Sequence, residues 1–165
     1  MSYEAIWRML YEIKYAYYYS EFYYDRFSKI DRVINYVSTL LSLAPIVTLG
    51  IDKLVPFAWA ILVAVVQGIN SIRPQFPYIK FMNVLPLYSK DMNALYVECH
   101  EEFLKLDKDN KEQCIELQVY MESALDELDS KYFSNGSMPD IKKLQTSAME
   151  ASNQDMGIKK LEGNK

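Results

Sequence analysis

The stretch that decides the predicted fold is residues 33–72, "VINYVSTLLSLAPIVTLGIDKLVPFAWAILVAVVQGINSI". A single acid and a single base, Asp52 and Lys53, separate two uncharged runs of 19 residues each, 33–51 and 54–72. A helix of that length measures about 28 Å, close to the ~30 Å hydrocarbon core of a bilayer. The alternative is a buried hairpin in a soluble bundle, but such a hairpin usually keeps a charged stripe toward water. The sequence therefore predicts an all-α membrane protein built on a two-helix transmembrane hairpin.

The bases that flank the two runs set the expected orientation. The turn between the runs carries only Lys53, whereas five bases precede the first run and Arg73, Lys80 and Lys90 follow the second. The positive-inside bias then places both termini in the cytoplasm and the turn outside. Gly50 suits the end of the first helix and Pro56 the first turn of the second. We therefore expect a membrane protein with both termini in the cytoplasm.

Both predicted spans carry polar residues that a lipid environment does not favour. Two interpretations remain open: they bond helices to one another, or they line a water-filled pore in an oligomer. A hairpin supplies two helices, so a pore requires several copies, four or more. The pore-lining candidates are Asn35, Ser38, Thr39, Ser42, Gln67, Asn70 and Ser71.

Three further features concern packing and charge. Ala60, Ala64 and Gly68 form a small-xxx-small ladder, which lets helices approach closely. Arg32 and Arg73 end the spans on the same side of the predicted membrane. They are interpreted either as interface anchors whose charged ends reach water or as a ring of positive charge at the inner mouth of a pore.

The remaining segments are predicted to form cytoplasmic helices. Residues 1–32 carry an aromatic stripe at helical spacing with balanced charge, which favours packing against a partner helix. After a proline-interrupted segment, residues 73–133 are expected to form two helices, one from Leu87 to about Leu106 and one capped by Asp109 or Asn110 and ending at Phe133. Residues 134–165 are expected to form a turn, a weak helix starting at Pro139 and a polar tail. The N- and C-terminal helices together would form a bundle.

Composition argues against most chemistry. The net charge is -4, and residues 98–129 hold eleven acids and three bases, which opposes general nucleic-acid binding. Cys99 and Cys114 are expected to be reduced thiols, and His100 and the calcium-like run at 107–110 are not expected to bind metal. No catalytic motif, signal peptide or lipidation motif is found. We expect no enzyme activity and no cofactor.

The layout resembles the SLATT class of small bacterial two-helix membrane effectors. The resemblance rests on "IWRMLYEIKYAYYYSEFYYDRFSKIDR", the hairpin, "SIRPQFPYIKF" and the helices ending "LDSKYF". It implies a protein of the bacterial inner membrane with a role in anti-phage defence, triggered by a nucleotide or oligonucleotide signal from a partner nucleotidyltransferase. It also implies a pore that damages the host membrane. It supplies no site residues.

Two functions follow as expectations. The first is an oligomeric pore-forming effector opened or held shut by a nucleotide-type signal or by a partner protein. The second is a membrane anchor or adaptor that holds a cytoplasmic enzyme or sensor at the bilayer. The expected partners are the lipid bilayer, further copies of the chain and the signal molecule.

Overall fold

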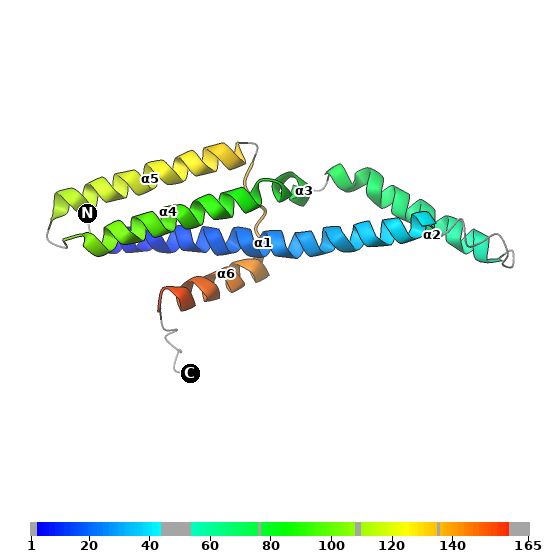
Figure 1. Ribbon diagram of the computed structural model, residues 1–165, viewed down its shortest axis with the longest axis horizontal. Coiled ribbons are helices and arrows are strands. Elements are labelled where there is room, and N and C mark those ends of the chain that lie inside the picture. Colours follow the sequence, from blue (N-terminus) through cyan, green and yellow to red (C-terminus); the bar gives the residue numbers. More distant parts are fainter. Residues whose placement is uncertain (1–2, 44–53, 76, 108–109, 135, 159–165) are drawn as a thin grey trace. The chain divides into compact units, whose positions relative to one another are not determined.

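The computed structural model describes residues 3–43, 54–75, 77–107, 110–134 and 136–158. All its regular elements are helices: α1 (Tyr3–Leu43), α2 (Leu54–Ile72), a 3-10 turn η3 (Arg73–Gln75), α3 (Pro77–Met82), α4 (Leu85–Lys105), α5 (Lys111–Phe133) and α6 (Lys142–Asp155) (Figure 1). The all-α part of the prediction is therefore confirmed. The predicted turn around Asp52 and Lys53 lies outside the described residues.

The chain forms two compact units. The bundle unit comprises Met1–Tyr24 and Asn83–Lys165, and the hairpin unit comprises Asp25–Met82. This division differs from the predicted boundaries at 32/33, 72/73 and 133/134. Helix α1 contributes to both units because residues 3–43 contain neither proline nor glycine to end it.

The membrane prediction is wrong. Over the described residues, no helix is both long enough and apolar enough to cross a bilayer. In α1, the described uncharged part extends only from Val33 to Leu43, about 16 Å of helix. In α2, Gln67 interrupts the apolar run after Val66, which leaves about 20 Å. The transmembrane hairpin and the inner-membrane location are both overturned by this finding.

The bundle unit has a core at the meeting of α1, α4 and α5. Ile6, Leu10 and Ile13 of α1 are at most 1% exposed and pack in one cluster with buried side chains of α4 and α5. The α4 and α5 members of this cluster are Tyr88, Met92, Leu95, Cys99, Phe103, Cys114, Leu117 and Met121. The aromatic stripe of α1 borders this aliphatic row, with the Tyr3 and Trp7 ring centroids 4.4 and 5.8 Å from that of Phe103. The predicted packing of the N-terminal helix on the later helices is present.

Polar contacts fix α4 against α5 along their length. Near one end, the Tyr120 hydroxyl donates to Glu98 Oε1 at 2.8 Å. Near the other end, the Tyr132 hydroxyl and the Lys131 ammonium both donate to Asp91 Oδ2, at 2.6 and 2.9 Å. These two hydrogen bonds hold the pKa of Asp91 below its usual value. These contacts hold the helix pair, which lies side by side in Figure 1, in one register.

The observed start of α5 agrees with the prediction, whereas the observed starts of α4 and α6 differ from it. Asn110 caps α5 as predicted, because its Oδ1 accepts from the backbone N–H groups of Glu112 and Gln113 at 3.1 and 3.2 Å. Helix α4 begins at Leu85, two residues before the predicted start, with Pro86 in its first turn. Helix α6 begins at Lys142 rather than Pro139, and the segment from Arg73 is short helical turns rather than irregular chain.

Helix α6 is tied to α1 before its start and at its end. The Tyr19 hydroxyl donates to the Pro139 carbonyl at 2.6 Å and accepts from the Ile141 N–H at 3.1 Å. At the other end, the buried Lys14 ammonium lies 2.7 Å from Asp155 Oδ2. The same ammonium lies over the rings of Tyr17, Tyr18 and Tyr96, 4.2 Å from the Tyr96 centroid. Aromatic faces and a carboxylate thus compensate the one buried lysine among the described residues.

We predict that the bundle unit loses stability at alkaline pH. Burial first, then a hydrogen bond to Glu21, raises the pKa of Tyr17 to about 12, and burial also raises the pKa of Tyr15, Tyr18 and Tyr19. The unfolded chain releases these protons near pH 10, whereas the folded chain keeps them. The free energy of unfolding should therefore be constant below about pH 10 and fall as the pH rises toward about 12.

Urea unfolding followed by circular dichroism across this pH range tests the prediction. Tyr17→Phe should flatten the decline, since it removes one of the titrating groups. A free energy of unfolding that stays constant up to about pH 12 would contradict it.

We also predict that neither cysteine reacts quickly in the folded protein. Cys99 and Cys114 are free and buried, and burial followed by the charge of Glu98 raises the pKa of the Cys99 thiol to about 11. Because the thiolate is the reactive form, iodoacetamide should modify both residues only after denaturation. Mass spectrometry of native and denatured samples measures this, and rapid native labelling of Cys99 would show that the prediction is wrong.

Candidate functional site

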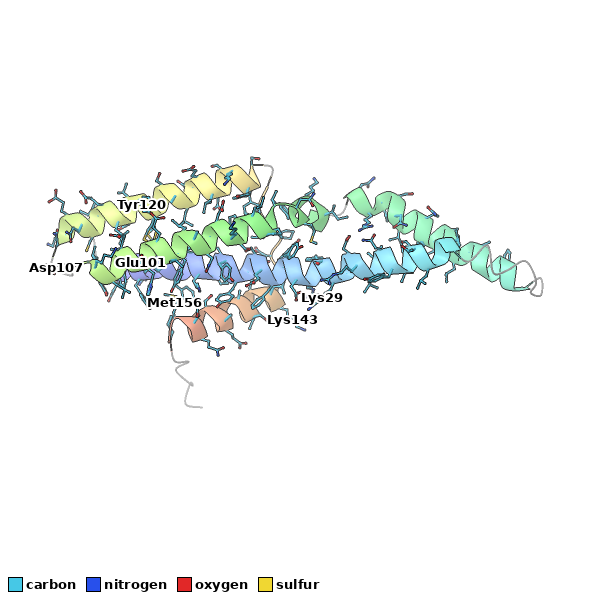
Figure 2. The ribbon with its side chains drawn as sticks, viewed as in Figure 1. Lys29, Glu101, Asp107, Tyr120, Lys143 and Met156 are labelled. Atoms are coloured by element: carbon cyan, nitrogen blue, oxygen red, sulfur yellow. The ribbon has the colours of Figure 1, made fainter. Side chains whose placement is uncertain are left out.

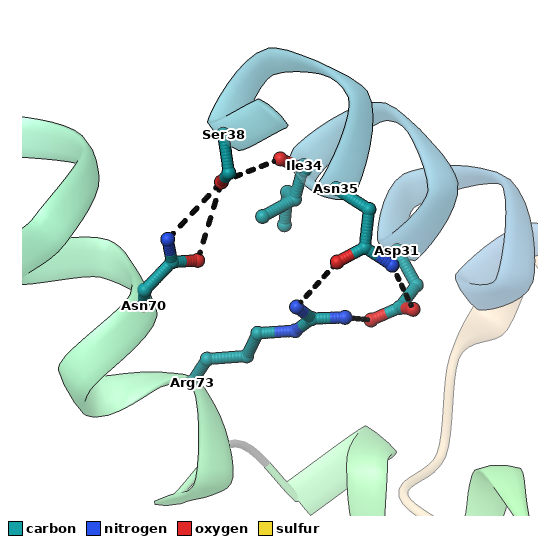
Figure 3. Close-up of polar contacts among 6 residues, drawn as sticks. All are labelled: Asp31, Ile34, Asn35, Ser38, Asn70 and Arg73. Carbon is teal, nitrogen blue, oxygen red and sulfur yellow. Dashed lines mark hydrogen bonds and ion pairs between the residues drawn. The ribbon is translucent and has the colours of Figure 1, made fainter. Parts of the chain in front are cut away.

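The candidate site is a polar cluster in the hairpin unit, where α1 faces α2 and η3. Its members are Asp31, Asn35, Ser38, Asn70 and Arg73 (Figure 3). The three α1 residues lie four and three positions apart, so they share one side of the helix. Asn70 stands in the last turn of α2, and Arg73 follows directly in η3.

Arg73 is the centre of the cluster. Its Nη1 donates to Asn35 Oδ1 at 2.7 Å, and its Nη2 forms an ion pair with Asp31. The Asn35 amide nitrogen in turn donates to Asp31 Oδ2 at 3.2 Å. The side chains of Arg73 and Asp31 are only 22% and 26% exposed, so solvent weakens this pair less than it weakens a surface pair. The guanidinium therefore bridges the two helical segments through two acceptors on α1.

A second bridge lies one turn further along α1. The Ser38 hydroxyl donates to its own helix at the Ile34 carbonyl, 2.8 Å away, and accepts from the Asn70 amide nitrogen at 3.1 Å (Figure 3). Ser38 and Asn70 are both half-buried. This arrangement leaves the serine proton inside its own helix and uses the asparagine as the donor between helices.

The structure places the other predicted residues outside this cluster. Thr39 and Ser71 donate to backbone carbonyls of their own helices, at Asn35 and Gln67, and the Gln67 side chain is exposed. Arg32 is exposed and donates to Ser28 Oγ at 3.3 Å. Arg32 and Arg73 therefore bind different partners. The side chain of Ser42 lies outside the described residues. Ala60, Ala64 and Gly68 are exposed on α2.

These contacts correspond to the interpretation in which the polar residues bond helices to one another. Asn35, Ser38, Asn70 and Arg73 bond α1 to α2 within one chain. The role as pore lining depended on transmembrane spans, which the described helices do not provide. The sequence reasoning missed Asp31, which was considered only as part of the balanced charge of residues 1–32. Its spacing of four from Asn35 was the signal that could have identified it.

The cluster has the chemistry of a structural joint. Its one carboxylate is paired with the one guanidinium, the Asn35 amide bonds to both of these groups, and the Asn70 amide bonds to the Ser38 hydroxyl. Among the described residues of the chain, no group of three or more histidine, cysteine, aspartate or glutamate side chains is arranged to hold a metal ion. No nucleophile–base pair is present among these five residues.

Comparison with known proteins gives no relative: no family model, no curated protein and no solved structure matches the chain. The resemblance to SLATT effectors therefore stays a prediction, and the functional argument rests on geometry.

We predict that Asp31 and Arg73 are energetically coupled. A double-mutant cycle of Asp31→Asn and Arg73→Gln should give a coupling of about 1 kcal/mol, because the pair is partly buried. The measurement is chemical unfolding of the full chain, followed by circular dichroism, in the wild-type chain, both single variants and the double variant.

The matched control is the Lys29–Asp25 ion pair in the same unit. Its side chains are 68% and 55% exposed, so solvent screens the pair and its coupling should be much smaller. Equal couplings for the two pairs would contradict a role for Arg73 in joining the helices.

Proposed function

We propose that the chain is a non-catalytic, self-associating helical protein, and that the hairpin unit joins it to further copies of itself. The observation that carries this proposal is the exposed apolar surface of α2. Contiguous exposed apolar side chains of this kind mark an interaction face. The large exposed side chains of α2 are Phe57, Ile61, Leu62, Val65, Ile69 and Ile72, with exposed fractions from 37% to 71%.

Among the side chains of α2 that the structure describes, those on one narrow side pack within the hairpin unit. The half-buried residues of α2 are Val63, Val66 and Asn70, and Arg73 continues them into η3. Their spacing of three and four defines a single stripe, which contains the contacts to α1 described above. Every other side chain of α2 that the structure describes is exposed.

Two adjacent rows on the exposed side fit a second copy of the same helix. Ala60, Ala64 and Gly68 form a shallow row, and a Cβ atom added at Gly68 would meet nothing within 4 Å. Phe57, Ile61 and Val65 form a ridge at the same four-residue spacing beside it. Ridges of one helix pack into grooves of another. A helix that carries both a ridge and a groove can match itself across a two-fold axis.

The resemblance suggests the role that such an assembly serves. We propose an effector of a bacterial defence system whose assembly is controlled by a partner protein. Control by a nucleotide is less favoured, because the described cavities of the bundle unit are acidic. One of them is lined by Glu98, Glu102 and Glu116 with Lys105 as its one base, and phosphate groups would be repelled there. The pore activity is not carried over.

We predict that Ala64→Leu and Gly68→Leu weaken self-association at least tenfold. Leucine would fill the groove that receives the ridge of the other copy. Within the monomer the space beside Gly68 is open and Ala64 is exposed. Leucine is a much better helix former than glycine and nearly as good as alanine, so the fold should be retained. Sedimentation velocity of the full chain without detergent measures the assembly, and circular dichroism checks the fold.

The matched control is Ala94→Leu, the same substitution at an exposed alanine of α4. It should leave the assembly unchanged. A monomeric wild-type chain, equal loss in all three variants, or flotation of the wild-type chain with phosphatidylcholine–phosphatidylglycerol vesicles would each overturn the proposal. The last outcome would assign the exposed face to lipid instead of to a second copy.

A further inference from the structure

The bundle unit contains a cavity beside its apolar core. Its volume is about 580 Å³, within the range of small-molecule sites. Side chains of α1, α4, the last turns of α5 and the segment preceding α6 form its walls. The residues that matter for the argument are Tyr15, Tyr19, Tyr88, Asp129, Phe133 and Asp140.

Aromatic rings in fixed positions form part of the cavity walls. Tyr15 and Tyr19 stack at 6.0 Å between centroids, and Tyr88 and Phe133 meet edge to face at 4.6 Å. Tyr19 and Tyr88 are 6% and 4% exposed and are each held by a hydroxyl hydrogen bond, so their positions are fixed. The negative faces of such rings attract organic cations.

Two carboxylates add negative charge to the same cavity. Asp129 accepts a hydrogen bond from the Tyr88 hydroxyl at 3.1 Å, and Asp140 accepts one from the Gln145 amide at 3.0 Å. Both donors are neutral, so they orient the carboxylates without cancelling their charge. Among the described residues, neither carboxylate takes part in an ion pair, and no lysine or arginine lines the cavity.

The tyrosines of the wall respond to this charge. Burial is the largest cause that raises the pKa of Tyr15 and Tyr88, and it is followed by the charges of Tyr19 and Asp140 for Tyr15 and of Asp129 for Tyr88. The carboxylates therefore act on the interior of the cavity as well as on the solvent.

We infer that this cavity binds an amphiphilic organic cation, with an ammonium or guanidinium group at Asp129 and Asp140 and an apolar body against the rings. The volume, the aromatic walls and the uncompensated carboxylates all favour this chemical class. An anion would be repelled by both carboxylates. A metal ion would require a set of ligating side chains, and the described part of the chain shows no such group of three.

Isothermal titration calorimetry of the full chain tests the inference with two probes of the same shape. Phenethylammonium carries the charge at neutral pH, and 2-phenylethanol is its neutral counterpart. The cation should bind at least tenfold more tightly than the alcohol. Its affinity should fall as sodium chloride is raised, because salt screens the carboxylates.

Matched variants locate the site. Asp129→Asn combined with Asp140→Asn should weaken the binding of the cation about tenfold, whereas Asp126→Asn, one turn away on α5, should leave it unchanged. Tyr15→Phe should keep the affinity and Tyr15→Leu should lower it, since leucine preserves apolar contact but removes the ring. Thermal unfolding of each variant confirms that the fold persists.

Three results would overturn the inference. They are equal affinity for the two probes, saturable binding by neither probe, or the same loss in Asp126→Asn as in the double variant. None of these results bears on self-association through α2, since the cavity belongs to the bundle unit.

Discussion

Both units of the protein depend on one uninterrupted helix. Helix α1 carries the aliphatic row Ile6, Leu10 and Ile13 into the bundle core and then presents Asp31, Asn35 and Ser38 to the hairpin. A single helix therefore lies in two different environments, with apolar packing in the bundle unit and polar contacts in the hairpin unit. This is possible because the acids and bases of α1 are either exposed or paired and do not interrupt its apolar row.

The two units are stabilised in different ways, and this difference bears on what each can do. The bundle has a continuous core and tyrosine and acidic side chains that connect its helices, with further acids such as Glu101 and Asp107 on its exterior (Figure 2). The hairpin has a narrow contact stripe and a broad apolar exterior. A unit with its own core is suited to recognition of a ligand or a partner. A unit whose apolar side chains remain uncovered gains most of its stability when another surface covers them.

Much of the fold could be predicted from local chemistry. Asn110, one of the two predicted caps, does begin α5, and the aromatic stripe of residues 1–32 predicted a helix that packs on others, because caps and helical periodicity are local signals. The end of the first helix was misplaced because the loss of charge after Arg32 was taken for a structural boundary, although charge does not end a helix. The start of α6 was misplaced because Tyr19, distant in sequence, holds Pro139 and Ile141 in non-helical chain. Part of the candidate site could be predicted: Asn35, Ser38, Asn70 and Arg73 were identified from their polarity or charge. Asp31 was missed although it lies four residues before Asn35, because its ion pair with Arg73 joins residues that are distant in sequence.

The burial of Lys14 has a consequence for how the folded chain meets amine reagents and proteases. Every other described lysine is exposed, whereas Lys14 lies under three tyrosine rings and against Asp155. Acylation or tryptic cleavage at Lys14 requires that the contacts covering it, the ion pair with Asp155 of α6 among them, open first, whereas the other described lysines are exposed to reagent. The reactivity of Lys14, compared with that of the other described lysines, therefore reports on the contacts that α6 and the tyrosine rings make with it.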